Sequence, residues 1–123
     1  MLNKIYSILF YANDLGKTLE FYKKLGFSLE LSEGTARVRF DNIKLAFVDE
    51  NKTEIKNESG MNPKGLGVFT YIEVENVDEY YQSLLEKGIK TSSEPKDWPC
   101  GKREFAVKDP DGYKLIFFTN VSN

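Results

Sequence analysis

The sequence predicts a single α+β domain built from two copies of a βαβββ module. Three observations predict it: strand-like and helix-like runs follow the same order in both halves, a glycine ends each helical run, and the halves correspond at a nearly constant offset. The 123 residues match the usual size of one domain. We place module one at about 1–49, a polar linker at about 50–65 and module two at about 66–123.

Module one opens with an apolar run over 5–12 that is rich in aromatic and β-branched residues, which is typical of a strand. Asn13-Asp14 then offers N-cap chemistry, and Gly26 ends the helix as a glycine just past a helix does. The apolar residues between them recur at helical spacing: Leu15, Leu19, Tyr22 and Leu25. Three further strands are expected, the last two joined by a turn at Asp41-Asn42: 28–32, 36–40 and 43–48.

Module two repeats this order. A strand over 68–75 is followed by Asn76 as N-cap, with Glu79 three residues later as in a capping box, and Gly88 ends the helix. The apolar face of this helix has helical spacing: Val77, Tyr80, Tyr81, Leu84 and Leu85. The remaining expected elements are a weak strand and two strong ones separated by a turn at 109–112: 89–92, 104–108 and 113–119.

The two modules correspond residue by residue. Gly26 and Gly88 are 62 residues apart, as are Asp14 and Asn76. Near the module ends, Lys44-Leu45-Ala46-Phe47 matches Lys114-Leu115-Ile116-Phe117 at an offset of 70. The repeated order therefore indicates an internal duplication.

Composition excludes several kinds of function. The net charge is −2, from 17 basic and 19 acidic residues without a basic cluster, so we expect no nucleic-acid partner. No apolar run approaches the roughly 20 residues of a membrane span and no secretory leader pattern is present, so we expect a cytoplasmic protein without a membrane partner. The absence of histidine excludes imidazole-based zinc sites and histidine-dependent nucleophiles. Cys100 is the single cysteine, and we expect an ordinary loop thiol rather than a catalytic one.

Several motifs carry a resemblance to a known family. They are Asn13-Asp14-Leu15, Glu20-Phe21-Tyr22 and Leu25-Gly26-Phe27 in module one, and the run from Trp98 to the turn Asp109-Pro110-Asp111-Gly112 in module two. With the paired modules, the chain resembles the vicinal oxygen chelate superfamily of glyoxalases, bleomycin resistance proteins and extradiol dioxygenases. The resemblance implies a curved mixed sheet around a cleft, often completed in a homodimer. In the metalloenzymes, up to four inward side chains hold one divalent metal.

The positions of those metal ligands can be carried over by counting. The first-strand ligand precedes the helix-start residue by seven, which gives Ser7 and Phe69. The last-strand ligand follows the turn glycine by four, which gives Ile116 and, through the offset of 70, Ala46. None of these side chains is a usual ligand for a divalent metal, so we expect neither a metal nor another cofactor. A metal held instead by Glu73 and Glu104 is the alternative.

The alternating strand positions predict a ligand-binding cleft lined largely by aromatic side chains, which suits a flat or amphipathic organic ligand. Residues such as Phe69 and Ile116 could equally be core, or serve both roles. The predicted lining residues are Ser7, Leu9, Tyr11, Phe47, Phe69, Tyr71, Glu73, Trp98, Phe105, Ile116 and Phe118.

These observations favour a metal-independent protein that binds or sequesters a small organic ligand of aromatic or cationic character, as a homodimer, without catalytic residues. The alternative is a divalent-metal-dependent lyase, isomerase or dioxygenase with unrecognised ligands, and fold alone does not decide between them. A metal-free enzyme that uses Glu73 or Tyr71 as base, and an accessory domain that pairs with another protein, also stay open.

Overall fold

The structure is a computed structural model that describes residues 1–40, 43–52 and 64–121. The chain divides into two compact units, Met1–Asn62 and Pro63–Asn123, which contain modules one and two. Each module is therefore described by itself. Most of the predicted linker at 50–65 and the whole predicted turn at Asp41-Asn42 lie outside the described residues.

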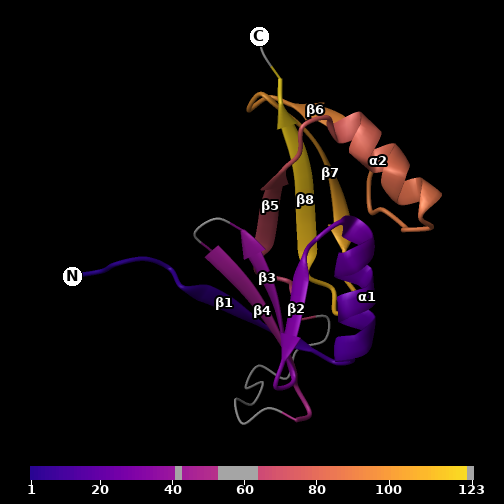
Figure 1. Ribbon diagram of the computed structural model, residues 1–123. Helices are drawn as coiled ribbons and strands as arrows, with labels where there is room; N and C mark the ends of the chain where they lie inside the picture. The colour runs from indigo at the N-terminus through magenta and orange to yellow at the C-terminus, as the bar shows by residue number, and fades with distance from the viewer. Residues whose placement is uncertain (41–42, 53–63, 122–123) are drawn as a thin grey trace. The chain divides into compact units, whose positions relative to one another are not determined.

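Module one is a four-stranded mixed sheet with one helix (Figure 1). Strand β1 pairs in parallel with β4, and β4–β3 and β3–β2 are antiparallel, so the strand order is β1-β4-β3-β2. The element bounds are β1 Ser7–Ala12, α1 Leu15–Leu25, β2 Leu29–Ser32, β3 Thr35–Phe40 and β4 Ile43–Asp49.

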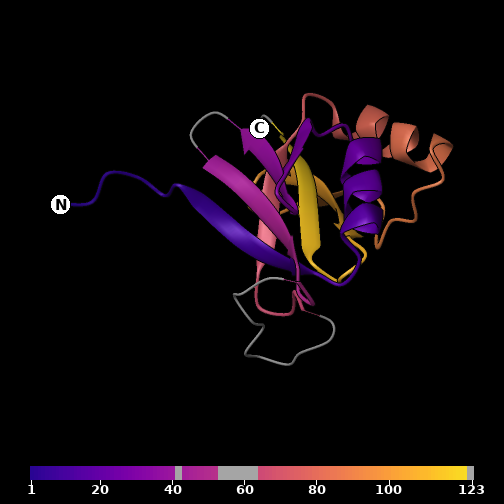
Figure 2. The same cartoon turned by 60° about the horizontal axis from the view of Figure 1, so that its bottom comes forward.

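Module two has the same topology, with strand order β5-β8-β7-β6 and a parallel pair β5–β8. Each helix contacts strands of its own sheet, α1 with β4 and β2 and α2 with β7 and β8; Figure 2 gives a second view of these elements. The bounds are β5 Phe69–Glu73, α2 Val77–Glu86, β6 Lys96–Trp98, β7 Lys102–Lys108 and β8 Lys114–Asn120. The predicted α+β class and the two βαβββ modules are confirmed, and the strand pairing forms two four-stranded sheets rather than one.

The predicted helix boundaries are confirmed by their hydrogen bonds. The side chain of Asp14 accepts from the backbone N–H of Lys17 at 3.1 Å, and Asn76 accepts from that of Glu79 at 3.1 Å. Gly26 ends α1 with φ 102°, a left-handed conformation that favours glycine.

Aromatic side chains fill the space between each helix and its sheet. In module one the rings of Tyr22 and Phe47 lie 4.6 Å apart, and in module two those of Tyr80 and Phe117 lie 4.7 Å apart. Tyr22, Phe47 and Phe117 are each 1% exposed. Such burial stabilises the fold by about 1.5–3 kcal/mol for each large side chain.

One predicted strand is wrong. No strand forms at 89–92, and the fourth strand of module two is β6, three residues long, at Lys96–Trp98. Ile89 is instead buried at the end of α2, where its N–H donates to the carbonyl of Leu84. The residues that follow contact β7 only through isolated hydrogen bonds at Ala106, whose carbonyl accepts from the N–H of Ser92 and whose N–H donates to Ser93 Oγ. Trp98, predicted in a loop, is the last residue of β6.

The turn at 109–112 is structural, as predicted. Asp109 Oδ1 accepts from the backbone N–H groups of Asp111 and Tyr113, both at 2.9 Å. Asp111 forms a buried ion pair with Lys64, with Nζ and Oδ1 2.8 Å apart and side chains 7% and 3% exposed. Gly65 lies directly against the backbone of Tyr113. The start of module two is therefore held on this turn.

Candidate functional site

Each sheet has one side that faces its helix and one side that does not, and we call the second side the open face. Directly paired residues of neighbouring strands share a face, so the strand register assigns every side chain. In module two the open face consists of residues 69, 71 and 73 of β5, 96 and 98 of β6, 102, 104, 106 and 108 of β7, and 114, 116, 118 and 120 of β8.

Most predicted lining residues of module two lie together on this open face. Phe69, Tyr71 and Trp98 are 54%, 52% and 46% exposed, which is a large apolar exposure for three aromatic side chains on one sheet. The rings of Tyr71 and Phe118 meet edge to face with centroids 6.1 Å apart. Ile116 lies in the middle of the face, directly beside Tyr71, and is 4% exposed.

The predicted residues of module one also share an open face. Ser7, Leu9 and Tyr11 lie on β1, where Leu9 is directly paired with Ala46 of β4. Ser7 and Leu9 are exposed, whereas Ala46 is buried. Large aromatic side chains are therefore less prominent here than on module two.

Two predicted lining residues point the other way. Phe47 packs on Tyr22 of α1, and Phe105 packs on Tyr81 of α2 with ring centroids 5.2 Å apart. Both are 1% exposed and form part of the core between helix and sheet. The prediction was wrong for these two because period-two alternation places Phe47 opposite in direction to Ala46, and Phe105 opposite to Ala106.

The four positions that would hold the family's metal do not fit a metal. Ser7 and Ala46 share the open face of module one, and Phe69 and Ile116 share that of module two. A hydroxyl, a methyl, a phenyl ring and an sec-butyl group provide no imidazole, thiolate or carboxylate. Within residues 1–40, 43–52 and 64–121, no three His, Cys, Asp or Glu side chains come together as a metal site would require.

The alternative ligands Glu73 and Glu104 are separated on the same face. Each is directly paired with Phe118, from opposite sides, so the phenyl ring stands between the two carboxylates. Their strands are two spacings apart, about 10 Å, so the two side chains could share a metal only by extending toward one another across Phe118. The carboxylate of Glu73 accepts from Asn120 Nδ2 at 3.1 Å.

Sequence reasoning missed the lysines of the open face. Three of them place their ammonium groups over aromatic rings of the same face. The pairs are Lys114 with Phe69 at 4.7 Å, Lys96 with Trp98 at 4.9 Å and Lys102 with Phe118 at 5.4 Å from the ring centroid. These lysines lie on three different strands and are far apart in the sequence. Their common face could be predicted only by combining the alternation along each strand with the pairing register of the strands.

Module one has a related arrangement. Lys44 lies over the ring of Tyr6 at 4.1 Å and donates to its hydroxyl at 2.9 Å. This hydrogen bond and the charge of Lys44 lower the pKa of Tyr6 below its ordinary value of 10, and Arg39 and Arg37 act in the same direction. The register places Lys44, Arg37 and Arg39 on the open face of module one, which is therefore also positively charged.

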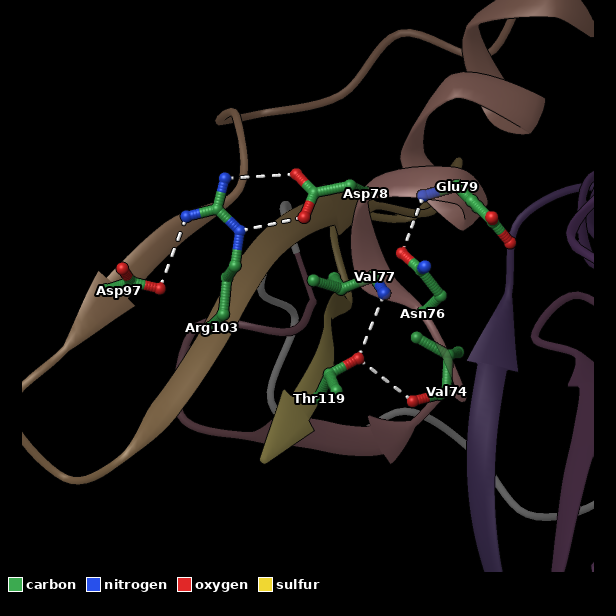
Figure 3. Close-up of polar contacts among 8 residues, drawn as sticks. All are labelled: Val74, Asn76, Val77, Asp78, Glu79, Asp97, Arg103 and Thr119. Carbon is green, nitrogen blue, oxygen red and sulfur yellow. Dashed lines mark hydrogen bonds and ion pairs between the residues drawn. The ribbon is translucent and has the colours of Figure 1, made fainter. Parts of the chain in front are cut away.

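An ion-pair cluster on the helix side of module two holds α2 to its sheet (Figure 3). Arg103 of β7 donates to both carboxylate oxygens of Asp78, at 2.9 and 3.0 Å, and to Asp97 at 3.2 Å. The hydrogen bonds from Arg103 lower the pKa of Asp78, and its two acidic partners raise the pKa of Arg103. In the same view, Thr119 accepts from the N–H of Val77 at 2.9 Å. These contacts are structural.

The described surface also contains two hollows. A hollow of about 560 Å³ in module one is lined by the residues around Asp14 and Gly34, and one of about 600 Å³ in module two by those around Asn76. Neither is lined by a predicted site residue. Cys100 is exposed in the turn between β6 and β7. Neither described helix has the length and apolar character needed to cross a membrane.

The duplicated βαβββ fold and its open sheet faces define a class of protein, and comparison with known proteins agrees. Residues 4–117 match the family model of the glyoxalase/bleomycin resistance protein/dioxygenase superfamily. The chain therefore belongs to this superfamily. It is 30% identical over 121 residues to a bleomycin resistance protein of Geobacillus stearothermophilus, which covers 89% of this chain and 92% of the relative.

Solved structures give the same fold. A glyoxalase/bleomycin resistance protein/dioxygenase from Nocardioides matches with a TM-score of 0.82 at 25% identity, over 100% of this chain and 87% of that one. A lactoylglutathione lyase from Agrobacterium tumefaciens matches with a TM-score of 0.74 at 18% identity, over 97% and 95%. The second likeness concerns the fold alone.

Proposed function

We propose that this protein binds, and in the cell sequesters, a small organic molecule without the help of a metal. The observation that carries the proposal is the open face of module two. There the metal-ligand positions of the family hold Phe69 and Ile116, and the surrounding aromatic side chains are half exposed. The relationship to a bleomycin resistance protein supports a binding role.

The exposed aromatic side chains give a physical reason for binding. Phe69, Tyr71 and Trp98 leave about half of their surface in water, although each would gain from burial. A flat organic ligand laid on this face would bury part of that surface while the polar side chains at its border orient the ligand. No proton transfer or bond cleavage is required of any residue, so the proposal assigns no catalytic residue.

We further propose that the protein is a cytoplasmic homodimer. One chain of this size has limited surface to enclose a ligand, and a second copy would supply more. Sedimentation at micromolar concentration tests this part, and a clean monomer would contradict it.

The test of the binding function is native mass spectrometry on untagged protein, since a histidine tag would bring in a metal of its own. We expect a protein mass without a divalent ion, and adducts that disappear on denaturation and have the masses of organic molecules. Thermal melting in the presence and absence of a chelator should coincide. One stoichiometric divalent ion per chain, with a melting temperature lowered by the chelator, would contradict the proposal and favour a metal-dependent enzyme of the same fold.

A further inference from the structure

We propose that the ligand of the module two open face is a small organic anion, with a flat aromatic body and one carboxylate, sulfonate or phosphate group. This inference rests on the proposed binding function and specifies its ligand. It departs from the cationic character allowed by the sequence alone. The evidence is the distribution of charge, the contacts of the lysine side chains and their recurrence in module one.

The open face is positively charged although the whole chain is not. Its strand residues include four lysines against two glutamates. The chain as a whole has a net charge of −2, so the acidic residues are concentrated elsewhere. The lysines of the face are Lys96, Lys102, Lys108 and Lys114. A face of this sign attracts anions and repels cations.

The lysine contacts also decide what the aromatic rings can bind. A cationic ligand would gain most by lying over a ring face, where the π electrons are richest. Those positions are already taken at Phe69, Trp98 and Phe118 by the ammonium groups of the protein itself. A cationic ligand would have to displace a lysine and would remain close to its charge.

An anionic ligand meets the opposite situation. The ammonium groups stand above the rings on flexible stems, so they can donate charge-assisted hydrogen bonds to an acidic group. The ring edges and the methylene stems of the lysines offer apolar contact to a flat body. Of the two opposing carboxylates, Glu73 is already engaged by Asn120.

A lysine that lies over an aromatic ring recurs in both modules, and the two lysines match in the duplication. Lys44 and Lys114 occupy matching positions of the duplication, each as part of a Lys-Leu-aliphatic-Phe run. Each is directly paired with the first residue of its neighbouring strand, Ser7 or Phe69. Each also places its ammonium over an aromatic ring, although the two rings do not match in the duplication: Tyr6 lies one residue before β1, whereas Phe69 is the first residue of β5.

The test uses three probes of one shape and different charge: 2-naphthoate, 2-naphthylmethanol and 2-naphthylmethylammonium. Trp98 is the only tryptophan, so its indole N–H gives a single resonance in a ¹H–¹⁵N spectrum of the full chain, and this resonance lies on the proposed face. We expect 2-naphthoate to shift it with a Kd about tenfold lower than that of the ammonium probe at low salt. Raising the ionic strength should narrow the difference.

Variants assign the effect to particular lysines. Lys102→Gln combined with Lys114→Gln should raise the Kd of 2-naphthoate about tenfold and leave that of 2-naphthylmethanol within about twofold. Lys87→Gln combined with Lys90→Gln, at and just beyond the end of α2, is the matched control with the same loss of two charges, and it should change neither Kd. The backbone resonances of each variant report whether it is folded.

The outcomes separate this inference from the function on which it rests. If the neutral or cationic probe binds as tightly as 2-naphthoate, or if the control variant weakens 2-naphthoate equally, the anion preference is wrong and the binding function stands. If no probe and no extracted metabolite anion shifts the Trp98 resonance at millimolar concentration, both are wrong for this face.

Discussion

The two modules are alike on the side that faces the helix and different on the open side. In both, a tyrosine of the helix packs on the phenylalanine of the last strand, at 4.6 Å for Tyr22–Phe47 and 4.7 Å for Tyr80–Phe117. The phenylalanines match in the duplication, but the tyrosines do not, since Tyr80 corresponds to Thr18. Both cores therefore contain the same tyrosine–phenylalanine contact, but the tyrosine comes from a different position of the helix in each module.

On the open face, by contrast, corresponding residues of the two modules differ in size. Ser7 and Ala46 of module one correspond to Phe69 and Ile116 of module two. Module one thus has small side chains at positions where module two has large ones, on corresponding strands that pair in the same way. The difference teaches that packing between helix and sheet limits one face of each sheet, whereas the other face is free to be shaped by what it binds.

The largest expected effect tests the shared core. Phe47→Ala and Phe117→Ala should each lower the free energy of unfolding by about 3–5 kcal/mol, because each removes a buried ring and leaves a cavity. Urea denaturation measures this. Leu31→Ala, at an exposed position of β2, is the control and should cost under about 0.5 kcal/mol. A cost below about 1 kcal/mol for one phenylalanine would show that the two cores are not equivalent.

The next effect concerns how module two begins. Gly65→Ala should cost about 1–3 kcal/mol, because its Cβ would collide with the backbone of Tyr113 and lie 2.7 Å from the carbonyl oxygen of Gly112. Gly67→Ala is the matched control, since nothing lies within 4 Å of a Cβ there. The start of module one differs: residues 1–6 are exposed and extend away from β1 (Figure 1), and Tyr6 contacts Lys44 at the surface rather than in a buried pair. Equal melting temperatures for the two variants would contradict the anchoring role.

A smaller effect sharpens the comparison of the helices. Asp78→Asn should cost about 0.5–1 kcal/mol at neutral pH, because its bidentate pair with Arg103 is partly exposed to solvent. The pKa of Asp78 is lowered in the folded protein, so the stabilisation is present above the ordinary carboxyl pKa and is lost as the pH falls through the lowered one.

Unfolding of wild type and Asp78→Asn, compared from neutral pH down to about pH 3, measures this dependence. The unfolding free energies of wild type and Asp78→Asn should become equal at the acidic end. At neutral pH, 1 M salt should reduce the difference between the two free energies. A gap that does not change with pH would mean that Asp78 acts through packing. Module one has Gly16 at the corresponding position, so its helix lacks this pair.

The smallest effect on stability is expected on the open face. Phe69→Ser places the module one residue in module two and should cost under about 1 kcal/mol, since Phe69 is half exposed and gives up one cation–π contact. The binding of 2-naphthoate, followed at the Trp98 resonance, should nevertheless weaken several-fold. A large loss of stability with unchanged binding would reassign Phe69 to the core.

Much of the fold could be read from residues close together in the sequence. The helix caps at Asp14 and Asn76, the stop at Gly26 and the turn at 109–112 each depend on contacts within a few residues, so local chemistry predicts them. The expected strand at 89–92 failed because Ile89 is drawn to the end of α2, a packing preference that its β propensity does not reveal.

The candidate site was only partly predictable for the same reason. Alternation along a strand correctly grouped Phe69, Tyr71 and Glu73, yet it could not say which side of the sheet the helix covers. Phe47 and Phe105 were therefore assigned to the wrong face, although each is an aromatic residue on a strand beside true members of the open face.

The sequence by itself determined the duplication, the order of elements and the loss of every family metal-ligand position, because these depend on residue identity and spacing along the chain. Only the tertiary structure decided the charge of the open face. Its lysines come from three strands and meet through hydrogen-bonded register, and their ammonium groups settle over the rings of Phe69, Trp98 and Phe118. Register is set by pairing between distant segments, so a ligand preference that depends on it is invisible until the strands are aligned.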